Sequence, residues 1–174
     1  AYLNRSAAEA YAIPEGILSI GEKAFSWCDK LPSVTIPDTV TCIGNDAFSN
    51  CQSLTSIVIP DSVTRIGYGA FAKCVSLTGV TIPDGVTRLE DSVFYRCESL
   101  NRITIPDGVT SIGDYAFYWL WADPSNVVDI SIPASVKSIG DYAFNNCLRG
   151  AAAENATISL RGVESIGKQA FYNC

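Results

Sequence analysis

Residues 54–74 read LTSIVIPDSVTRIGYGAFAKC, and close variants of this stretch recur along the whole chain. Six of seven copies carry a proline eleven residues before a phenylalanine, and six carry a cysteine three residues after it. The phenylalanines, spaced by 23, 23, 23, 23, 27 and 27 residues, are Phe25, Phe48, Phe71, Phe94, Phe117, Phe144 and Phe171. Units in register at this spacing predict a solenoid, in which each unit buries its apolar side against the next.

Each part of the unit predicts a local structure. Ser33–Ile36 alternates polar and β-branched apolar residues, as a half-buried strand does, and Pro37–Asp38 then starts a turn. Val40–Ile43 is a second short extended piece, and Asn45–Phe48 is a capped turn or short helix with the Phe inside. The expected ladder of parallel strands is 34–36, 57–59, 80–82, 103–105 and 130–132, with all seven Phe rings in one buried column.

Composition excludes several classes of function. The 174 residues include 12 Lys and Arg against 18 Asp and Glu, so clustered basic side chains for a nucleic-acid partner are not expected. The sequence has no His, phosphate-binding Gly loop or nucleophile elbow, so we expect neither catalysis nor a cofactor. No apolar run approaches the ~20 residues of a membrane-spanning helix, so no membrane insertion of this segment is expected.

The full pattern is similar to a known family. Leu54-x-x-Ile57-x-Ile59-Pro60, continued by Val63-x-x-Ile66-Gly67-x-x-Ala70-Phe71-x-x-Cys74, resembles the leucine-rich repeats of the BspA type. The resemblance runs from about Ala8 to Cys174. It implies a right-handed, curved solenoid of about seven turns, with a parallel sheet on its concave face and short helices or turns on the other side. It also implies surface or secreted, adhesin-like proteins of host-associated microbes, without a common enzymatic activity.

The repeats define one expected domain, residues 1–174. The expected units are 8–30, 31–53, 54–76, 77–99, 100–126, 127–154 and 155–174. The fifth unit departs from the pattern, because Leu120 replaces the cysteine and four extra residues follow. The chain lacks an initial Met and stops in mid-unit at Cys174, so we expect it to be a piece of a longer array.

Two periodic columns of residues are candidate chemical sites. The cysteines Cys28, Cys51, Cys74, Cys97, Cys147 and Cys174 should stack with parallel side chains, an arrangement that suits buried free thiols better than disulfides. Cys42 lies outside this column and should be more exposed. Acidic residues follow the repeat prolines at Glu15, Asp38, Asp61, Asp84 and Asp107. They could gather calcium, but one carboxylate per turn favours a simple turn preference, so no metal is expected.

The solvent side of the strand row is the expected binding face, because solenoids bind along their concave side. The face begins at Ala10 and Ala12. Its candidate binding residues are Ser33, Thr35, Ser56, Val58, Gly79, Thr81, Arg102, Thr104, Asp129 and Ser131. The aromatic residues Tyr118, Trp119 and Trp121 form a second candidate. They could be exposed interface anchors or rings tucked against the core, and the sequence leaves both open.

The preferred hypothesis is a protein-interaction or adhesion module at the cell surface or secreted. Its partner would be a protein ligand such as a host extracellular or cell-surface protein. One alternative is a structural spacer that holds other domains away from the cell. Another is an intracellular repeat scaffold, which reduced cysteines would suit.

Overall fold

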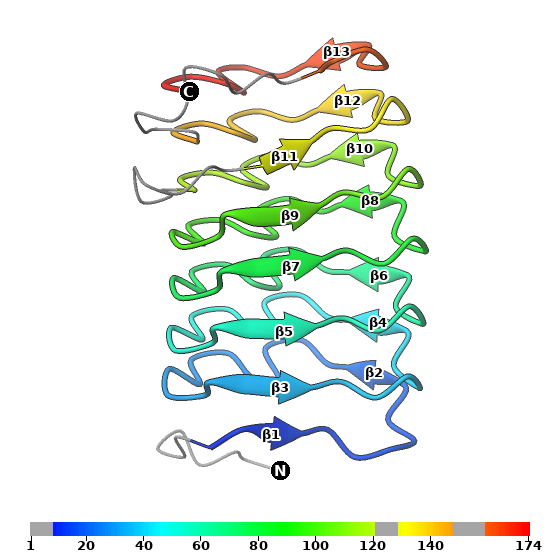
Figure 1. The fold of residues 1–174 in the computed structure, drawn as a ribbon, viewed down its shortest axis with the longest axis vertical. Helices are drawn as coiled ribbons and strands as arrows, with labels where there is room; N and C mark the ends of the chain where they lie inside the picture. The colour runs from blue at the N-terminus through cyan, green and yellow to red at the C-terminus, as the bar shows by residue number, and fades with distance from the viewer. Residues whose placement is uncertain (1–8, 121–128, 148–158) are drawn as a thin grey trace.

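The computed structural model describes residues 9–120, 129–147 and 159–174. The described chain winds into one stack of turns (Figure 1). The longer strands at the front of Figure 1 run left to right, and the shorter strands behind run right to left. Because the chain climbs from the N-terminus to the C-terminus, the solenoid is right-handed, as expected.

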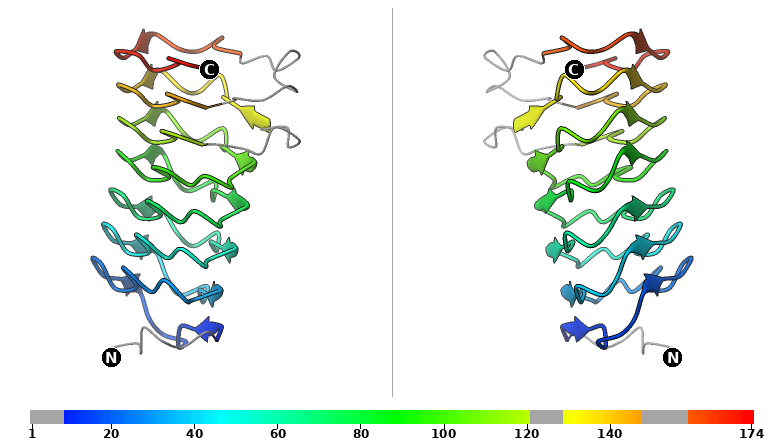
Figure 2. Two further views of the ribbon diagram at one scale, coloured as in Figure 1. Left: turned by 90° about the vertical axis from the view of Figure 1, so that its left-hand side faces the viewer. Right: turned by 90° about the vertical axis from the view of Figure 1, so that its right-hand side faces the viewer.

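Strands lie along two sides of the stack, which Figure 2 shows edge-on. A six-stranded sheet has the order β1-β3-β5-β7-β9-β11, and every pair is parallel. Its strands are β1 (Tyr11–Ala12), β3 (Ser33–Thr35), β5 (Ser56–Val58), β7 (Gly79–Thr81), β9 (Arg102–Thr104) and β11 (Asp129–Ser131). The second row forms two sheets, β2-β4-β6 and β8-β10-β12-β13. Its strands are β2 (Ser19–Ile20), β4 (Cys42–Ile43), β6 (Arg65–Ile66), β8 (Arg88–Leu89), β10 (Ser111–Ile112), β12 (Ser138–Ile139) and β13 (Ser165–Ile166).

The strands of the six-stranded sheet start and end one residue earlier than predicted. Thr35 is the last residue of β3, and its carbonyl accepts the final ladder bond, from the Ile13 N–H at 3.0 Å. The strand cannot continue because Ile36 precedes Pro37, which has no N–H to donate. The predicted alternation is confirmed, since Val34 is buried between half-buried Ser33 and exposed Thr35.

The segment between Gly and Cys is a turn in every repeat, and the described residues contain no helix. In the second repeat Asp46 and Asn50 have φ angles of 53° and 61°. The N–H groups of Asp46 and Phe48 donate to the carbonyls of Tyr68 and Ala70 in the next turn, at 2.7 and 2.8 Å. These donors are therefore used between turns rather than within a helix. The short-helix alternative is wrong for the described residues, in which the segment is a turn.

The phenylalanines form one continuous column, as predicted. Ring centroids of successive repeats lie 5.0–5.7 Å apart from Phe25 to Phe171. The rings are buried from Phe25 to Phe144, whereas Phe171, at the end of the column, is partly buried. This column runs through all seven expected units, although the exact bounds of the units and of the domain stay a prediction.

One glycine position controls how closely the turns approach. A Cβ on Gly113 would collide with the Asp91 carboxylate and would lie 2.6 Å from the Asp91 backbone nitrogen. Glycine permits the contact, so the Gly113 N–H donates to the Leu89 carbonyl at 2.8 Å and the Asp114 N–H donates to Asp91 Oδ1 at 3.0 Å. The same repeat position holds glycine in six units, as at Gly113, and Glu90 in the fourth unit. The second strand row is interrupted there, between β6 and β8.

Candidate functional site

The predicted binding face is the outer surface of the six-stranded sheet, at the front of Figure 1. We call it the strand ribbon, and the residues of it whose exposure the structure describes are Ser33, Thr35, Ser56, Val58, Gly79, Thr81, Arg102, Thr104 and Ser131. Ser33 and Gly79 are half-buried and the others are exposed. Asp129 pairs with Arg102 in the backbone register, but its side chain lies outside what the structure describes. The residues of the ribbon come from five successive strands, β3, β5, β7, β9 and β11, so the ribbon extends over five turns.

The ribbon has two rows of residues, and one row consists of β-branched side chains. We call this row, Thr35, Val58, Thr81 and Thr104, the strip. Val58 pairs with Thr35 on one side, and because Ser56 pairs with Gly79, Thr81 is its neighbour on the other. Val58 is 79% exposed. Thr104 continues the strip, paired in register with Thr81. Each of these residues is exposed, and branching at Cβ restricts the rotamers that its side chain can adopt. A partner could therefore bury a narrow apolar strip with little loss of side-chain entropy.

The cysteine column is buried except at Cys174, and none of its cysteines forms a disulfide in the described residues. Cys28, Cys51, Cys74, Cys97 and Cys147 are buried, Cys42 is half-exposed and Cys174 is exposed. Each described donor thiol lies close to the carbonyl of the preceding repeat's phenylalanine, as Cys97 Sγ donates to Phe71 O at 3.1 Å. Burial raises the pKa of the Cys51 and Cys97 thiols to about 12. The sequence predicted unbridged thiols, but it did not reveal this S–H bond between turns.

The acidic column lies on an exposed corner of the stack. Glu15, Asp38, Asp61, Asp84 and Asp107 are all exposed. Within the described ranges, no three His, Cys, Asp or Glu side chains come together as metal ligands would. No helix in the same part of the chain is long and apolar enough to cross a bilayer.

The second predicted candidate lies on the turns, away from the strand ribbon. Tyr118 and Trp119 are half-buried, so the structure matches neither extreme of the prediction, and Trp121 lies outside the described residues. Tyr118 stacks on Tyr95 with ring centroids 5.2 Å apart and is tilted against Trp119 at 6.0 Å. The guanidinium of Arg96 lies 5.7 Å from the Trp119 ring centroid, within cation–π range.

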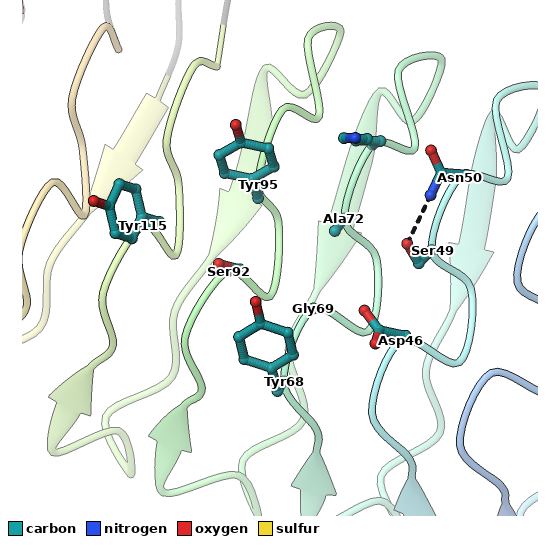
Figure 3. Close-up of a pocket in the computed structure, with 10 residues that line it drawn as sticks. Asp46, Ser49, Asn50, Tyr68, Gly69, Ala72, Ser92, Tyr95 and Tyr115 are labelled. Carbon is teal, nitrogen blue, oxygen red and sulfur yellow. Dashed lines mark hydrogen bonds between the residues drawn. The ribbon is translucent and has the colours of Figure 1, made fainter.

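A groove that the sequence did not predict lies beside these rings. It has a volume of about 460 Å³ and is bounded by Tyr68, Tyr95 and Tyr115 on one side of Ala72 (Figure 3). We call it the tyrosine groove. It lies across the repeats on both sides of the break between β6 and β8. Its signal in the sequence is a small residue, Ala72, at a repeat position that holds Tyr95 one turn later.

Comparison with known proteins relates the whole chain to one repeat family. The sequence model described as BspA type leucine-rich repeat region matches residues 1–122 and 120–174, with six copies. Among solved structures, a leucine-rich repeat protein of T. pallidum is 30% identical with a TM-score of 0.77, covering 95% of this chain and 76% of that one. Searching curated proteins gives no match.

Two further solved structures extend the comparison. A leucine-rich cell surface protein of Faecalibacterium prausnitzii is 34% identical with a TM-score of 0.61. The match covers 90% of this chain but 48% of that protein, so this chain spans about half of it. A leucine-rich repeat protein of Bacteroides ovatus is 23% identical with a TM-score of 0.54, covering 94% of this chain and 57% of that one. This last likeness concerns the fold alone.

Proposed function

Since the chain belongs to the BspA-type leucine-rich repeat family, we propose that it is a non-catalytic module that binds a protein partner through the strand ribbon. The observation that carries the proposal is the exposed strip of β-branched side chains Thr35, Val58, Thr81 and Thr104. Neighbouring strands hold these four side chains in one line, and Val58 is 79% exposed in the middle. Repeat folds of this kind bind along extended surfaces of several turns.

The chemistry of the strip favours a broad and shallow contact. Val and Thr side chains offer methyl groups and hydroxyls, but none can reach into a deep pocket of the partner. Affinity would therefore come from many modest contacts over several turns rather than from one anchor. The exposed guanidinium of Arg102, on β9 of the ribbon, adds a charged group that can select for polar groups of the partner.

The place of action that fits this module is the cell surface or its surroundings, and the partner that fits is a host extracellular or cell-surface protein. The printed description of the Faecalibacterium prausnitzii relative as a cell surface protein supports this placement. The absence of His among the 174 residues supports a module without acid–base catalysis.

The test is to measure partner binding after placing charge on the ribbon. The double substitution Thr81→Glu with Thr104→Glu puts two carboxylates on the strip without touching buried side chains. In a screen of immobilised extracellular-matrix and cell-surface proteins, we expect the intact chain to bind and this variant to lose at least tenfold in affinity. The change in unfolding free energy should stay within about 0.5 kcal/mol, because both sites are exposed.

The matched control is Thr64→Glu with Thr87→Glu, which makes the same change at exposed threonines away from the ribbon. It should leave binding intact. A structural spacer would tolerate both pairs and retain no specific partner. If Trp119→Ala with Trp121→Ala abolishes binding while the ribbon variant binds normally, the working surface is the aromatic segment instead.

A further inference from the structure

The tyrosine groove exists because two columns of stacked rings begin in neighbouring turns, one at Tyr95 and one at Tyr115. Tyr95 stacks on Tyr118 with ring planes 10° apart, and Tyr115 stacks on Tyr142 at 5.0 Å with planes 8° apart. One turn earlier, the equivalent positions of these columns hold Ala72 and Ser92, which have no ring. The first ring of each column therefore keeps a face that no ring of the preceding turn covers.

The space in front of these rings has an apolar floor. Ala72 is nearly buried between the flanking turns, and Gly69, next to it, has no side chain at all. Tyr68, which is 50% exposed, closes the side of the space. The volume of about 460 Å³ is within the range of small-ligand sites, which is about 300–1,000 Å³. A flat ring placed over Ala72 would stack on Tyr95 in the place where the preceding turn has no aromatic side chain.

The opposite wall of the groove is polar. Asp46, Ser49 and Asn50 lie across Ala72 from the tyrosines (Figure 3). Asn50 Nδ2 donates to Ser49 Oγ at 3.0 Å, so the Ser49 hydroxyl keeps its own proton to donate. The carboxylate of Asp46 extends over the floor, where only a glycine leaves room, since a Cβ at Gly69 would lie 2.6 Å from Asp46 Oδ1.

The groove is lined by one negative and one positive side chain. The groove has one carboxylate, Asp46, and one ammonium group, Lys73, and neither forms an ion pair with another described residue. The rim therefore offers acceptors and donors without favouring a charged ligand. The three tyrosine hydroxyls add groups that both donate and accept.

We propose that the tyrosine groove is a carbohydrate site, which binds one pyranose ring of a neutral glycan over Ala72. A pyranose has a flat face of C–H groups, which would lie on the uncovered face of Tyr95. Its hydroxyls project around its rim, where Asp46, Ser49 and Lys73 could pair with them. An aromatic side chain of a protein would fill the same space but would desolvate this polar rim without pairing it. The site is separate from the strand ribbon and does not depend on the function proposed for the ribbon.

The repeat itself supplies the test variants, because the position after each column phenylalanine accepts both Ala72 and Tyr95. The substitution Ala72→Tyr adds the missing ring and fills the groove, and Tyr95→Ala removes the platform. The matched control is Tyr172→Ala, which removes a 53% exposed tyrosine at the same repeat position but outside the groove. Circular dichroism would check that all three variants fold like the parent.

The probes are cellotetraose, maltotetraose, chitotetraose and mannotetraose, tested by saturation-transfer NMR and then by titration calorimetry. We expect the intact chain to bind at least one of them, Tyr95→Ala to weaken binding at least tenfold, and Ala72→Tyr to abolish it. Tyr172→Ala should stay within about twofold of the parent. The proposal is overturned if none of the four binds at about 10 mM. It is also overturned if folded Ala72→Tyr binds like the parent, or if it instead loses a protein partner while no oligosaccharide binds.

Discussion

Removing one ring from the middle of the phenylalanine column should be among the most costly single changes in this chain. Phe71 is fully buried and lies between Phe48, 5.4 Å away, and Phe94, 5.5 Å away, measured between ring centroids. Phe71→Ala loses the burial of the ring, about 1.5–3 kcal/mol, and two aromatic contacts of about 0.5–1.5 kcal/mol each. The turns above and below are fixed by backbone hydrogen bonds, so the cavity cannot collapse. We expect a loss of about 3–5 kcal/mol.

The matched control is the last ring of the same column. Phe171 is partly buried and has one described ring neighbour, Phe144, at 5.2 Å. With about half of the contacts, Phe171→Ala should cost about 1–2.5 kcal/mol. Both phenylalanines occupy the same repeat position. The two variants therefore compare the loss of a ring that has two ring neighbours with the loss of a ring that has one described ring neighbour.

The measurement is urea unfolding followed by far-UV circular dichroism, at equal protein concentration for both variants. Contacts in a solenoid join neighbouring turns, so the central variant should also broaden the transition as the two halves separate. A loss below about 1.5 kcal/mol for Phe71→Ala, or one no larger than for Phe171→Ala, would contradict this reasoning.

Two further predictions concern thiol ionisation and turn spacing. Burial raises the pKa of Cys97 from 9.0 to about 12, so the unfolded chain releases this proton first and the thiol's contribution to stability is lost as pH rises from 9 to 12. In urea unfolding above pH 9, the parent should therefore lose up to about 1.4 kcal/mol per pH unit relative to Cys97→Ala, and equal slopes would refute this. Gly113→Ala should cost about 1–3 kcal/mol, because its Cβ collides with Asp91, whereas Gly21→Ala, with open space at its Cβ, should change stability by less than about 1 kcal/mol. Equal thermal shifts for the two alanine variants would show that close approach is not the function of the glycine.

The repeat predicted most of the fold, because a periodic sequence forces equivalent residues into the same environment. The spacing of the phenylalanines was enough to place Phe25 and Phe171 in one column and to make the strands parallel. The turn geometry was not predictable in the same way. Lys23 and Trp27 have φ angles of 55° and 64°, although neither residue type favours that region. Their N–H groups donate to Asn45 and Ser49 of the next turn at 2.9 and 2.8 Å, so the neighbouring turn imposes their conformation.

The candidate sites differ in how far the sequence could reveal them. The strand ribbon follows from alternation, so Thr81 and Thr104 could be assigned to the outer surface from their spacing alone. The tyrosine groove depends instead on what is missing from a column. Ala72 is an unremarkable residue by itself. It marks a site only because Tyr95 and Tyr118 follow it at one-turn intervals and stack, which the three-dimensional register reveals.

The same backbone arrangement explains how one solenoid can carry two independent surfaces. The position after the column phenylalanine holds Ala72 in one turn and Tyr95 in the next, yet the Lys73 N–H still donates to the Tyr95 carbonyl at 2.7 Å. Hydrogen bonds between turns thus fix the backbone whatever side chain stands there, while Phe71 and Phe94 fix the register from inside. Substitutions on the turns should consequently not reach the strand ribbon, because the rigid phenylalanine core lies between the two faces. Loss of oligosaccharide binding at the groove and loss of protein binding at the ribbon should therefore occur in separate variants of an equally stable chain.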